Sequence, residues 1–498
     1  MIRGLVAILA LACTSLHAEE SPLWSRQFTW TRDHLPLVTV SISQGRDEIT
    51  LRGVSAPVRL LSEGPGGPEV NGGTRWRIRL EKPAQPARLR WHIVVASFSS
   101  SERTHLDREL QRWRSRDLRP QTFEIGTLFG VSGQVVDDRR LLVTVAPAED
   151  EAAARHQAQA LAARFRVHTS LHREIVEPPH GLLVAEDEHF TRVHGDSVLW
   201  FAPQEGLLAV EPVDPPSGTG AARGLYSGQI YLTIDALGRL TAVNVVPEDR
   251  LLGGLLPSEM GAAAPQEALK AQAVAARTEL FAKLGTRHLD APFRLCSTVH
   301  CQVYGGASKE DPRTAAAVTA TRGELLARRD GHLVDAVYSA SCGGHTEDND
   351  RAWATDPDPA LRGVADDHCA KSDWSRRLEG SALAQASHLG ALKSFEVLER
   401  GVSQRVVRLR LTGTEGTIEA HSELAVRRLL GDLPSALFTF SLERSPDGTL
   451  RTLQLTGKGH GHGVGLCQSG AMGMAAEGQG YREILQHYYR GTTIRKLY

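Results

Sequence analysis

Two adjacent stretches, LLGGLLPSEM at residues 251–260 and PQEALKAQAVAARTEL at residues 265–280, decide the fold of the C-terminal half. The second stretch predicts a helix, because Pro265 suits a first helical turn and Glu267 favours the positive N-terminal end of the helix dipole. Its interior is almost entirely apolar, and a helix that is apolar on nearly all sides is buried. Gln272 and Arg277 lie inside it, so we expect both to find polar partners and to hold a neighbouring loop.

Glu259 lies in the segment before this helix, which we expect to be a loop. It follows the apolar run Leu255-Leu256-Pro257 and precedes Met260. Apolar surroundings desolvate a carboxyl and raise its pKa, and a glutamic acid that keeps its proton near neutrality can act as a general acid. The alternative is structural, with Glu259 capping the helix or pairing with Arg277.

The segment CSTVHCQVYGG, residues 296–306, places two thiols and an imidazole within six residues. Cys296, His300 and Cys301, completed by His288, would supply the ligand types that zinc prefers, in a closed, non-catalytic site. The spacing is not a Cys-x-x-Cys knuckle, and adjacent His300 and Cys301 can bind one ion only if the chain turns sharply. A disulfide between Cys296 and Cys301 is the alternative.

The first eighteen residues read as a secretory signal peptide: Arg3 precedes an apolar run, and small and polar residues end at Ala18. A lipoprotein anchored at Cys13 is an alternative, although Ala10 stands where such signals carry Leu. No later run of 18 apolar residues occurs, so we expect a secreted, periplasmic or cell-envelope protein. In such a compartment Cys342 and Cys369 are candidates for a disulfide, which would contribute about 3 kcal/mol. Two buried free thiols are the alternative.

The chain divides into regions with different patterns, and we expect an α+β, multidomain protein. Short strand-like runs at 25–90 predict a β-rich unit. Residues 91–181 follow the order βαββαβ, which resembles a SPOR-like domain, a class that binds peptidoglycan strands stripped of peptides; a ferredoxin-like spacer without a ligand is the alternative. Such a unit would leave one sheet face free. A Gly/Pro-rich linker at 213–222 then precedes a mixed α/β domain at 223–498.

Composition excludes several classes. The 498 residues are 41% hydrophobic and 23% charged, which is typical of globular proteins. Lys and Arg number 57 against 58 Asp and Glu, giving a net charge of -1. No overall basic field steers this chain onto nucleic acid, so we expect no nucleic-acid partner.

Ordered motifs over residues 223–498 resemble the stage II sporulation protein D / LytB amidase-enhancer family of exported proteins that act on bacterial peptidoglycan. The blocks are PSEM with EALKAQAVAART, then CQVYGG, SCGGHTE, and GHGVGLCQSGA with HYYRGT. The resemblance implies that Glu259, in the PSEM block, is the catalytic residue of a lytic transglycosylase. It also implies groove or supporting roles for Gln272, Arg277, His460, His462 and Gln468. Some members of the family carry zinc at the block around Cys296.

The sequence departs from the family pattern at three positions. Glu279 stands where an aromatic residue is usual, His460 replaces Trp in the Gly-Trp-Gly-His-Gly block, and Ser469 replaces the Trp after Gln468. Since aromatic rings hold sugars in many sites, these changes put the sugar groove in doubt.

Lytic transglycosylases cleave the bond between N-acetylmuramic acid and N-acetylglucosamine without water and leave a 1,6-anhydro product. The resemblance therefore predicts cleavage of peptide-free glycan strands by a single Glu, with no cofactor needed for catalysis and zinc only as a structural ion. A non-catalytic wall-binding protein that enhances a cell-wall amidase is the main alternative. A zinc peptidase is a weaker one, because no His-Glu-x-x-His helix occurs.

Overall fold

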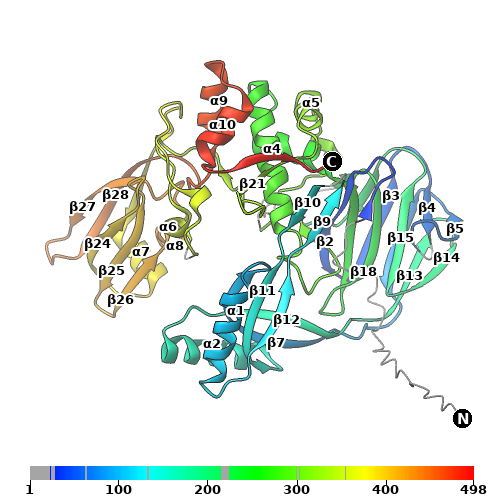
Figure 1. Ribbon diagram of the computed structural model, residues 1–498, viewed down its shortest axis with the longest axis horizontal. Coiled ribbons are helices and arrows are strands. Elements are labelled where there is room, and N and C mark those ends of the chain that lie inside the picture. The colour runs from blue at the N-terminus through cyan, green and yellow to red at the C-terminus, as the bar shows by residue number, and fades with distance from the viewer. Residues whose placement is uncertain are drawn as a thin grey trace, which may run out of the picture.

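The computed structural model describes residues 23, 29–61, 64–131, 134–214, 224–298, 300–301, 303–353 and 355–498 (Figure 1). The predicted signal peptide at 1–18, with Cys13, lies outside the described residues. Within the described part, no helix is both long and apolar enough to span a membrane. The protein is strand-rich, mixed α and β, and built from several sheets.

Two packed sheets form a β-sandwich, seen on the right of Figure 1. Their shared core includes Val40 and Ile42 from one sheet and Leu51, Trp76 and Ile78 from the other. The eight-stranded sheet has the order β1 (Thr29–Trp30), β2 (Pro36–Arg46), β19 (Leu240–Pro247), β18 (Gln229–Ile234), β15 (Val198–Pro203), β4 (Val58–Leu61), β5 (Glu69–Asn71), with β20 (Leu295–Cys296) also beside β2. The six-stranded sheet has the order β14 (Arg192–Asp196), β13 (Leu182–Asp187), β6 (Arg75–Leu80), β3 (Glu48–Gly53), β16 (Leu208–Glu211), β17 (Gly224–Tyr226).

The strand pairing corrects the domain boundaries expected from the sequence. β2, from the segment predicted as a separate β-rich unit, pairs with β19, with Val38 opposite Val246 and Val40 opposite Asn244. β16 and β17, on either side of the predicted linker at 213–222, also pair with each other. The alternation of apolar and polar residues in a strand predicts that the strand lies in a sheet but not which distant strand pairs with it. Here β2 and β19 are about 200 residues apart in sequence.

A smaller unit is inserted into the sandwich between β6 and β13. It contains β7 (Arg88–Ser99), α1 (Arg103–Arg114), β8 (Gln121–Ile125), β11 (Arg140–Ala148), α2 (Glu151–Phe165) and β12 (Ser170–Glu177), with sheet order β12-β7-β11-β8. Leu106 and Trp113 of α1 and Ala158 of α2 pack on Ile93 and Val143, so both helices cover one face. A hairpin, β9 (Leu128–Val131) with β10 (Gln134–Asp137), is inserted into the predicted order.

The opposite face of this small sheet is not fully free, in contrast to the expectation. Val94, Ile125 and Leu142 on that face pack with Leu289, from the loop that follows α4 (Gln266–Lys283). Arg173 on the edge strand β12 forms an ion pair with the neighbouring Asp290. The C-terminal half thus covers part of the surface that a SPOR-like domain would present to glycan.

The helical layer lies in the centre of Figure 1 around α4. The helix predicted at 265–280 is confirmed, and it is buried along most of its length. The other elements of this layer are α3 (Glu248–Glu259), α5 (Pro312–Ala320), α6 (Asn349–Ala352), α9 (Gln468–Ala476), α10 (Tyr481–Tyr488), the 3-10 turns Ala307–Lys309 and Pro359–Leu361, and the pairs β21 (Glu324–Ala327) with β30 (Thr493–Lys496) and β22 (Tyr338–Ser339) with β29 (Leu466–Cys467).

A C-terminal lobe, on the left of Figure 1, is inserted between Cys369 and the Gly/His segment that begins at Gly459. It has its own apolar core, which includes Leu409, Leu411 and Leu453. Its elements are β23 (Asp373–Glu379), α7 (Gly380–Ser387), β24 (Leu392–Arg400), β25 (Val406–Gly413), β26 (Thr417–His421), α8 (Glu423–Leu429), β27 (Phe438–Arg444) and β28 (Leu450–Lys458). The strands of this lobe form two three-stranded sheets, β23-β28-β27 and β24-β25-β26.

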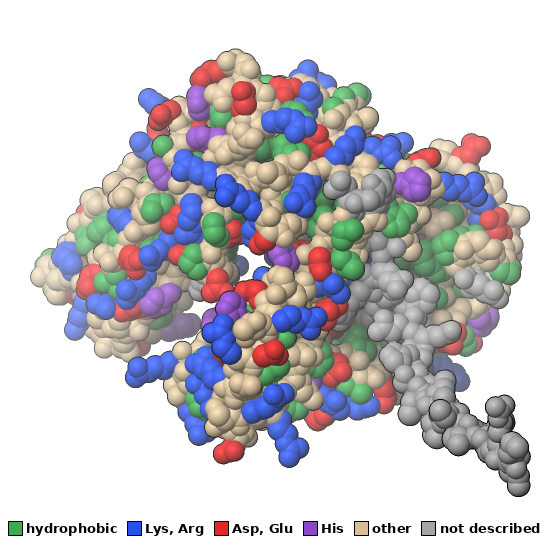
Figure 2. All heavy atoms as spheres, viewed as in Figure 1, with side chains coloured by type: hydrophobic (Ala, Val, Ile, Leu, Met, Phe, Trp, Pro, Cys, Tyr) green, Lys and Arg blue, Asp and Glu red, His purple; other side chains and the backbone are tan. Residues whose placement is uncertain are grey.

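Lys and Arg side chains lie among Asp and Glu side chains over the face shown in Figure 2. This mixture agrees with the net charge of -1 and gives the face no single-sign field.

Candidate functional site

Glu259 is the last residue of helix α3, which corrects the expected loop. Gly253, Gly254 and Pro257 all disfavour a helix, but buried Leu252, Leu255 and Leu256 anchor it against α4 and α5. Gly254 is required at its position, because a Cβ there would come within 2.7 Å of the Gly306 carbonyl oxygen. Tertiary packing therefore overrides local propensity and fixes where Glu259 projects.

The half-buried carboxyl of Glu259 has an unusually high pKa. Burial, followed by the nearby negative charge of Glu279, raises it to about 7, while Lys283 and a hydrogen bond with Gln468 act in the opposite direction. A carboxyl in this state is substantially protonated at neutral pH. Glu259 therefore has the titration range of a general acid/base.

Glu279 and Lys283 form an ion pair one turn apart on α4. The Lys283 ammonium also donates to the backbone carbonyl of Cys301 at 2.7 Å. The half-buried hydroxyl of Tyr338 donates to Glu279, and its pKa is raised by burial and by the charges of Glu279 and Glu259. Tyr338 thus stays protonated and available as a hydrogen-bond donor beside the two carboxyls.

Gln468, which forms a hydrogen bond with Glu259, also contacts Gln272. The amide of Gln468, at the start of α9, donates to the Oε1 atom of Gln272 at 3.4 Å. Gln272 is fully buried, and its Nε2 atom has no hydrogen-bond partner within the described part of the chain. The fold therefore brings together two predicted groove residues from segments 196 residues apart.

Arg277 does not face Glu259, contrary to the groove role implied by the resemblance. Its guanidinium is fully buried, donates to Glu248 at 2.5 Å and to the carbonyls of Val318 and Thr321 at 3.2 and 2.8 Å. Glu248 also accepts a hydrogen bond from the Tyr498 hydroxyl at 2.7 Å. Arg277 is a structural residue that holds the end of α5, as the buried helix pattern predicts.

The two histidines of the Gly/His segment have different environments. His460 has an exposed side chain, and its backbone pairs with Ser341 through two hydrogen bonds of 2.9 and 3.1 Å. His462 is half-buried and packs on Trp353, with ring centroids 4.8 Å apart. Burial and nearby Arg405 lower the pKa of His462 to about 3, so its ring is neutral.

The four predicted zinc ligands lie together. The side chains of His288, Cys296, His300 and Cys301 place their donor atoms within 4.8 Å of one another, and the Nδ1 atom of His300 lies 3.6 Å from each sulfur. The chain turns sharply here, because the Cys301 amide donates to the Thr298 carbonyl at 3.1 Å. This turn lets the side chains of adjacent His300 and Cys301 point toward the same position.

Cys342 and Cys369 are both free thiols, so the disulfide expected between them is not formed in the structure. They lie in a second cluster with Asp366 and Cys467, whose donor atoms also fall within 4.8 Å of one another. Asp366 and Cys467 could not be predicted to join them, because they come from segments far apart in sequence: a loop before the C-terminal lobe and strand β29.

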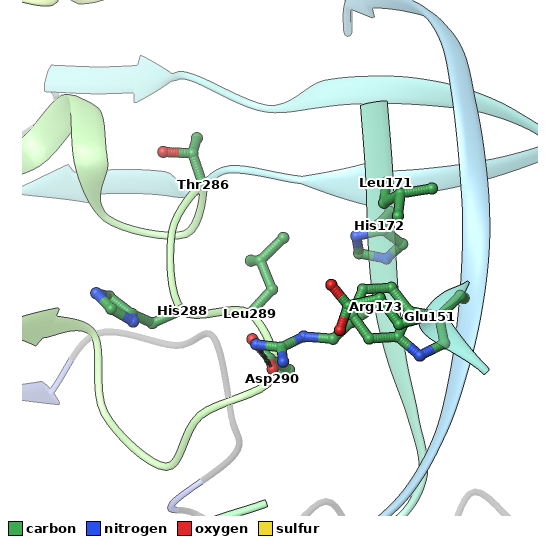
Figure 3. A pocket seen from close by; sticks show the side chains of 9 residues that line it. Glu151, Leu171, His172, Arg173, Thr286, His288, Leu289 and Asp290 are labelled. Carbon is green, nitrogen blue, oxygen red and sulfur yellow. Dashed lines mark ion pairs between the residues drawn. The ribbon is translucent and has the colours of Figure 1, made fainter. Parts of the chain in front are cut away.

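A cavity of about 330 Å³ lies where β12 and the start of α2 meet the loop after α4 (Figure 3). The figure shows Arg173 and Asp290 paired at its edge, with His172 and His288 on its walls. None of the residues described above around Glu259 lines it. The cavity is therefore separate from the Glu259 site.

Comparisons with known proteins identify the family to which the chain belongs. A family model described as stage II sporulation protein matches residues 236–327, which contain Glu259, Glu279 and Cys296. A protein of Brachyspira hyodysenteriae without assigned function is 32% identical over 51% of this chain and 68% of its own length. The chain belongs to the stage II sporulation protein D and amidase-enhancer family.

Two named members of the family show how far the similarity extends. The stage II sporulation protein D of Bacillus amyloliquefaciens is 28% identical over 51% of this chain and 75% of its own length. The amidase enhancer of Bacillus subtilis is 29% identical over 49% of this chain but only 40% of its own length. A second model, a domain of unknown function, matches residues 363–465, which include the inserted C-terminal lobe.

Of the three positions that depart from the family pattern, the structure shows Glu279 beside Glu259. Ser469, in contrast, turns its hydroxyl to accept a hydrogen bond from the Ala370 amide at 3.0 Å. Sequence reasoning noticed Glu279 only as a departure and missed Lys283 and Tyr338. The signal for the Glu279–Lys283 pair was its i, i+4 spacing on a helix that was already predicted to be buried.

Proposed function

We propose that this protein is an exported lytic transglycosylase that cleaves bacterial peptidoglycan, with Glu259 as its acid/base. One observation carries the proposal: the half-buried carboxyl at the end of α3 has its pKa raised to about 7. The relatives named stage II sporulation protein D and amidase enhancer support a role at the cell wall. Peptide-free glycan strands are the proposed substrate.

A single carboxyl is sufficient for this reaction. Most glycosidases need a second carboxylate as nucleophile or base, but here the O6 hydroxyl of muramic acid attacks its own C1. Protonated Glu259 gives its proton to the glycosidic oxygen as the C1–O bond breaks. The carboxylate then accepts the O6 proton as the new C1–O6 bond forms, which regenerates the acid and leaves a 1,6-anhydro end.

Some neighbours of Glu259 set its pKa, and others orient its carboxyl. Glu279 and burial keep Glu259 protonated, while Lys283 limits the rise in its pKa. Gln468 orients the carboxyl, and Gln272 in turn holds Gln468. Gln272 is fully buried, so it positions Gln468 and does not itself reach a sugar.

We propose a structural zinc ion at His288, Cys296, His300 and Cys301. A tetrahedral site of this composition needs donor atoms roughly 3.3–3.8 Å apart, and the His300 Nδ1 atom lies 3.6 Å from both sulfurs. The ion would fix the Cys301 carbonyl that accepts from Lys283. It has no part in the chemical step.

Incubation with peptide-free glycan strands, followed by mass spectrometry of the products, tests the proposal. The wild-type protein should produce anhydro-muramyl ends, and Glu259→Gln should reduce their formation at least ~100-fold while glycan binding survives. Glu267→Gln is the matched control, because Glu267 pairs with Lys270 at 2.7 Å on the exposed start of α4. Equal cleavage by wild type and Glu259→Gln would refute the assignment.

An amidase enhancer without cleavage is the second candidate. The relative of that name favours it, as does exposed His460 where the family has Trp. It predicts glycan binding and stimulation of a cell-wall amidase, with no anhydro ends from the wild-type protein. The same product analysis therefore separates the two functions.

A further inference from the structure

The cluster of Cys342, Asp366, Cys369 and Cys467 has the composition and spacing of a second metal site. The Cys369 and Cys467 sulfurs are 3.6 Å apart, and the Cys342 sulfur lies 3.1 Å from the Asp366 Oδ2 atom. A tetrahedral zinc site with 2.3 Å Zn–S bonds needs sulfurs roughly 3.8 Å apart. The donor atoms therefore already lie near the corners that such an ion requires.

One donor atom in this cluster lacks any other partner. Asp366 is 1% exposed, and its Oδ2 atom accepts a hydrogen bond from the Tyr488 hydroxyl at 2.9 Å. Its Oδ1 atom is buried and has no hydrogen-bond partner within the described residues. A buried carboxylate oxygen left unpaired is costly, and a cation bound by the Asp366 carboxylate would offset that cost.

Backbone amides donate hydrogen bonds to two of the cluster's sulfurs. The Cys467 sulfur accepts from the amides of Cys342 and Gly470 at 3.2 and 3.3 Å, and the Cys342 sulfur accepts from the Gly344 amide at 3.4 Å. The buried guanidinium of Arg405 donates to the Cys342 carbonyl at 2.8 Å, which places a positive charge beside the cluster. Hydrogen bonds from outer residues orient metal ligands and tune their charge.

A disulfide explains the cluster less well. Three thiols can form only one disulfide, which would leave one thiol unused and the Asp366 Oδ1 atom without a hydrogen-bond partner among the described residues. Zinc uses all four donors, and a site with four protein ligands is closed and structural.

We propose that Cys342, Asp366, Cys369 and Cys467 bind a second zinc ion that fastens three separate segments of the family domain together. These segments are the turn after β22, the loop before the C-terminal lobe, and β29, which leads directly into Gln468. Zinc binding here is independent of the proposed cleavage activity.

Metal analysis of the full chain, purified without chelators, tests this site. We expect two zinc ions per chain in the wild type and one in Cys369→Ser, whose side chain is the least buried of the four. Cys301→Ser should also lose one ion, from the first cluster. Ser341→Ala is the matched control, because its hydroxyl lies 3.3 Å from the Cys369 sulfur but is not a ligand; it should retain both ions.

Thiol labelling of the wild-type protein gives a second measurement that does not depend on a variant's folding. Cys342, Cys369 and Cys467 should be recovered as free thiols that react with iodoacetamide only after zinc is chelated. A disulfide between any two of them would overturn the proposal. So would a zinc content that Cys369→Ser leaves unchanged in a folded protein.

Discussion

At the scale of single residues, Glu279 adds to the effect of burial on the pKa of Glu259. Its negative charge contributes to the raised pKa of Glu259, and Lys283 opposes it. In Glu279→Gln that contribution disappears and Lys283 loses its ion-pair partner, so the pKa of Glu259 should fall. Because cleavage begins from protonated Glu259, activity should disappear at a lower pH than in the wild type.

The pH dependence of kcat/KM measures this effect, since its limbs report the pKa values of the free enzyme. Glu279→Gln should lose activity at neutral pH and approach the wild-type rate in more acidic buffer. Glu267→Gln should leave the profile in place. A Glu279→Gln profile that coincides with the wild-type profile would show that Glu279 does not tune the acid.

At the scale of helices, the buried pair Glu248–Arg277 joins α3, α4 and the end of α5. Both side chains are fully buried, so Glu248→Gln would leave the Arg277 charge uncompensated. Breaking such a pair costs about 3–5 kcal/mol. We expect Glu248→Gln to lower the free energy of unfolding in urea by that amount.

Glu267→Gln again provides the comparison, because its partly exposed carboxyl lies in the first turn of α4. Its loss should be at most about 1 kcal/mol. Equal losses for the two variants would mean that the buried pair contributes little.

The difference between these two glutamates shows which features of the structure could be predicted from the sequence. Cys296, His300 and Cys301, the proposed zinc ligands, are close in sequence, so their spacing predicted a cluster of side chains that the fold forms. Partners of Glu248 and Cys342 come from distant segments, which no local pattern identifies. Helix α3 was not predicted because Gly253, Gly254 and Pro257 have low helix propensity. In the folded protein, packing of its buried leucines stabilises the helix.

At the scale of the whole molecule, the Glu259 site depends on strands from both halves of the chain. Helix α3 continues directly from β19, and β19 lies between β18 and β2 in the eight-stranded sheet. The family model, in contrast, matches only from residue 236. The region that carries the family signature therefore shares a sheet with strands that precede it in the chain.

This arrangement predicts the behaviour of truncated proteins. A fragment of residues 224–498 loses β2 and β15, which flank β18 and β19, and exposes the buried side chains of Tyr231, Val243 and Val246. Exposed apolar strand edges promote aggregation. We expect this fragment to be insoluble when it is expressed alone.

Co-expression with residues 1–214 should restore a soluble complex, because the break falls between β16 and β17 and each half then supplies its strands to the shared sheets. Soluble yield and co-elution on size-exclusion chromatography measure both outcomes. If residues 224–498 alone gave a soluble monomer that unfolds cooperatively, the C-terminal half would be autonomous, and the strands before it would serve only as an attached module. If the two halves co-elute and neither is soluble alone, then the sandwich is part of the structure that holds Glu259.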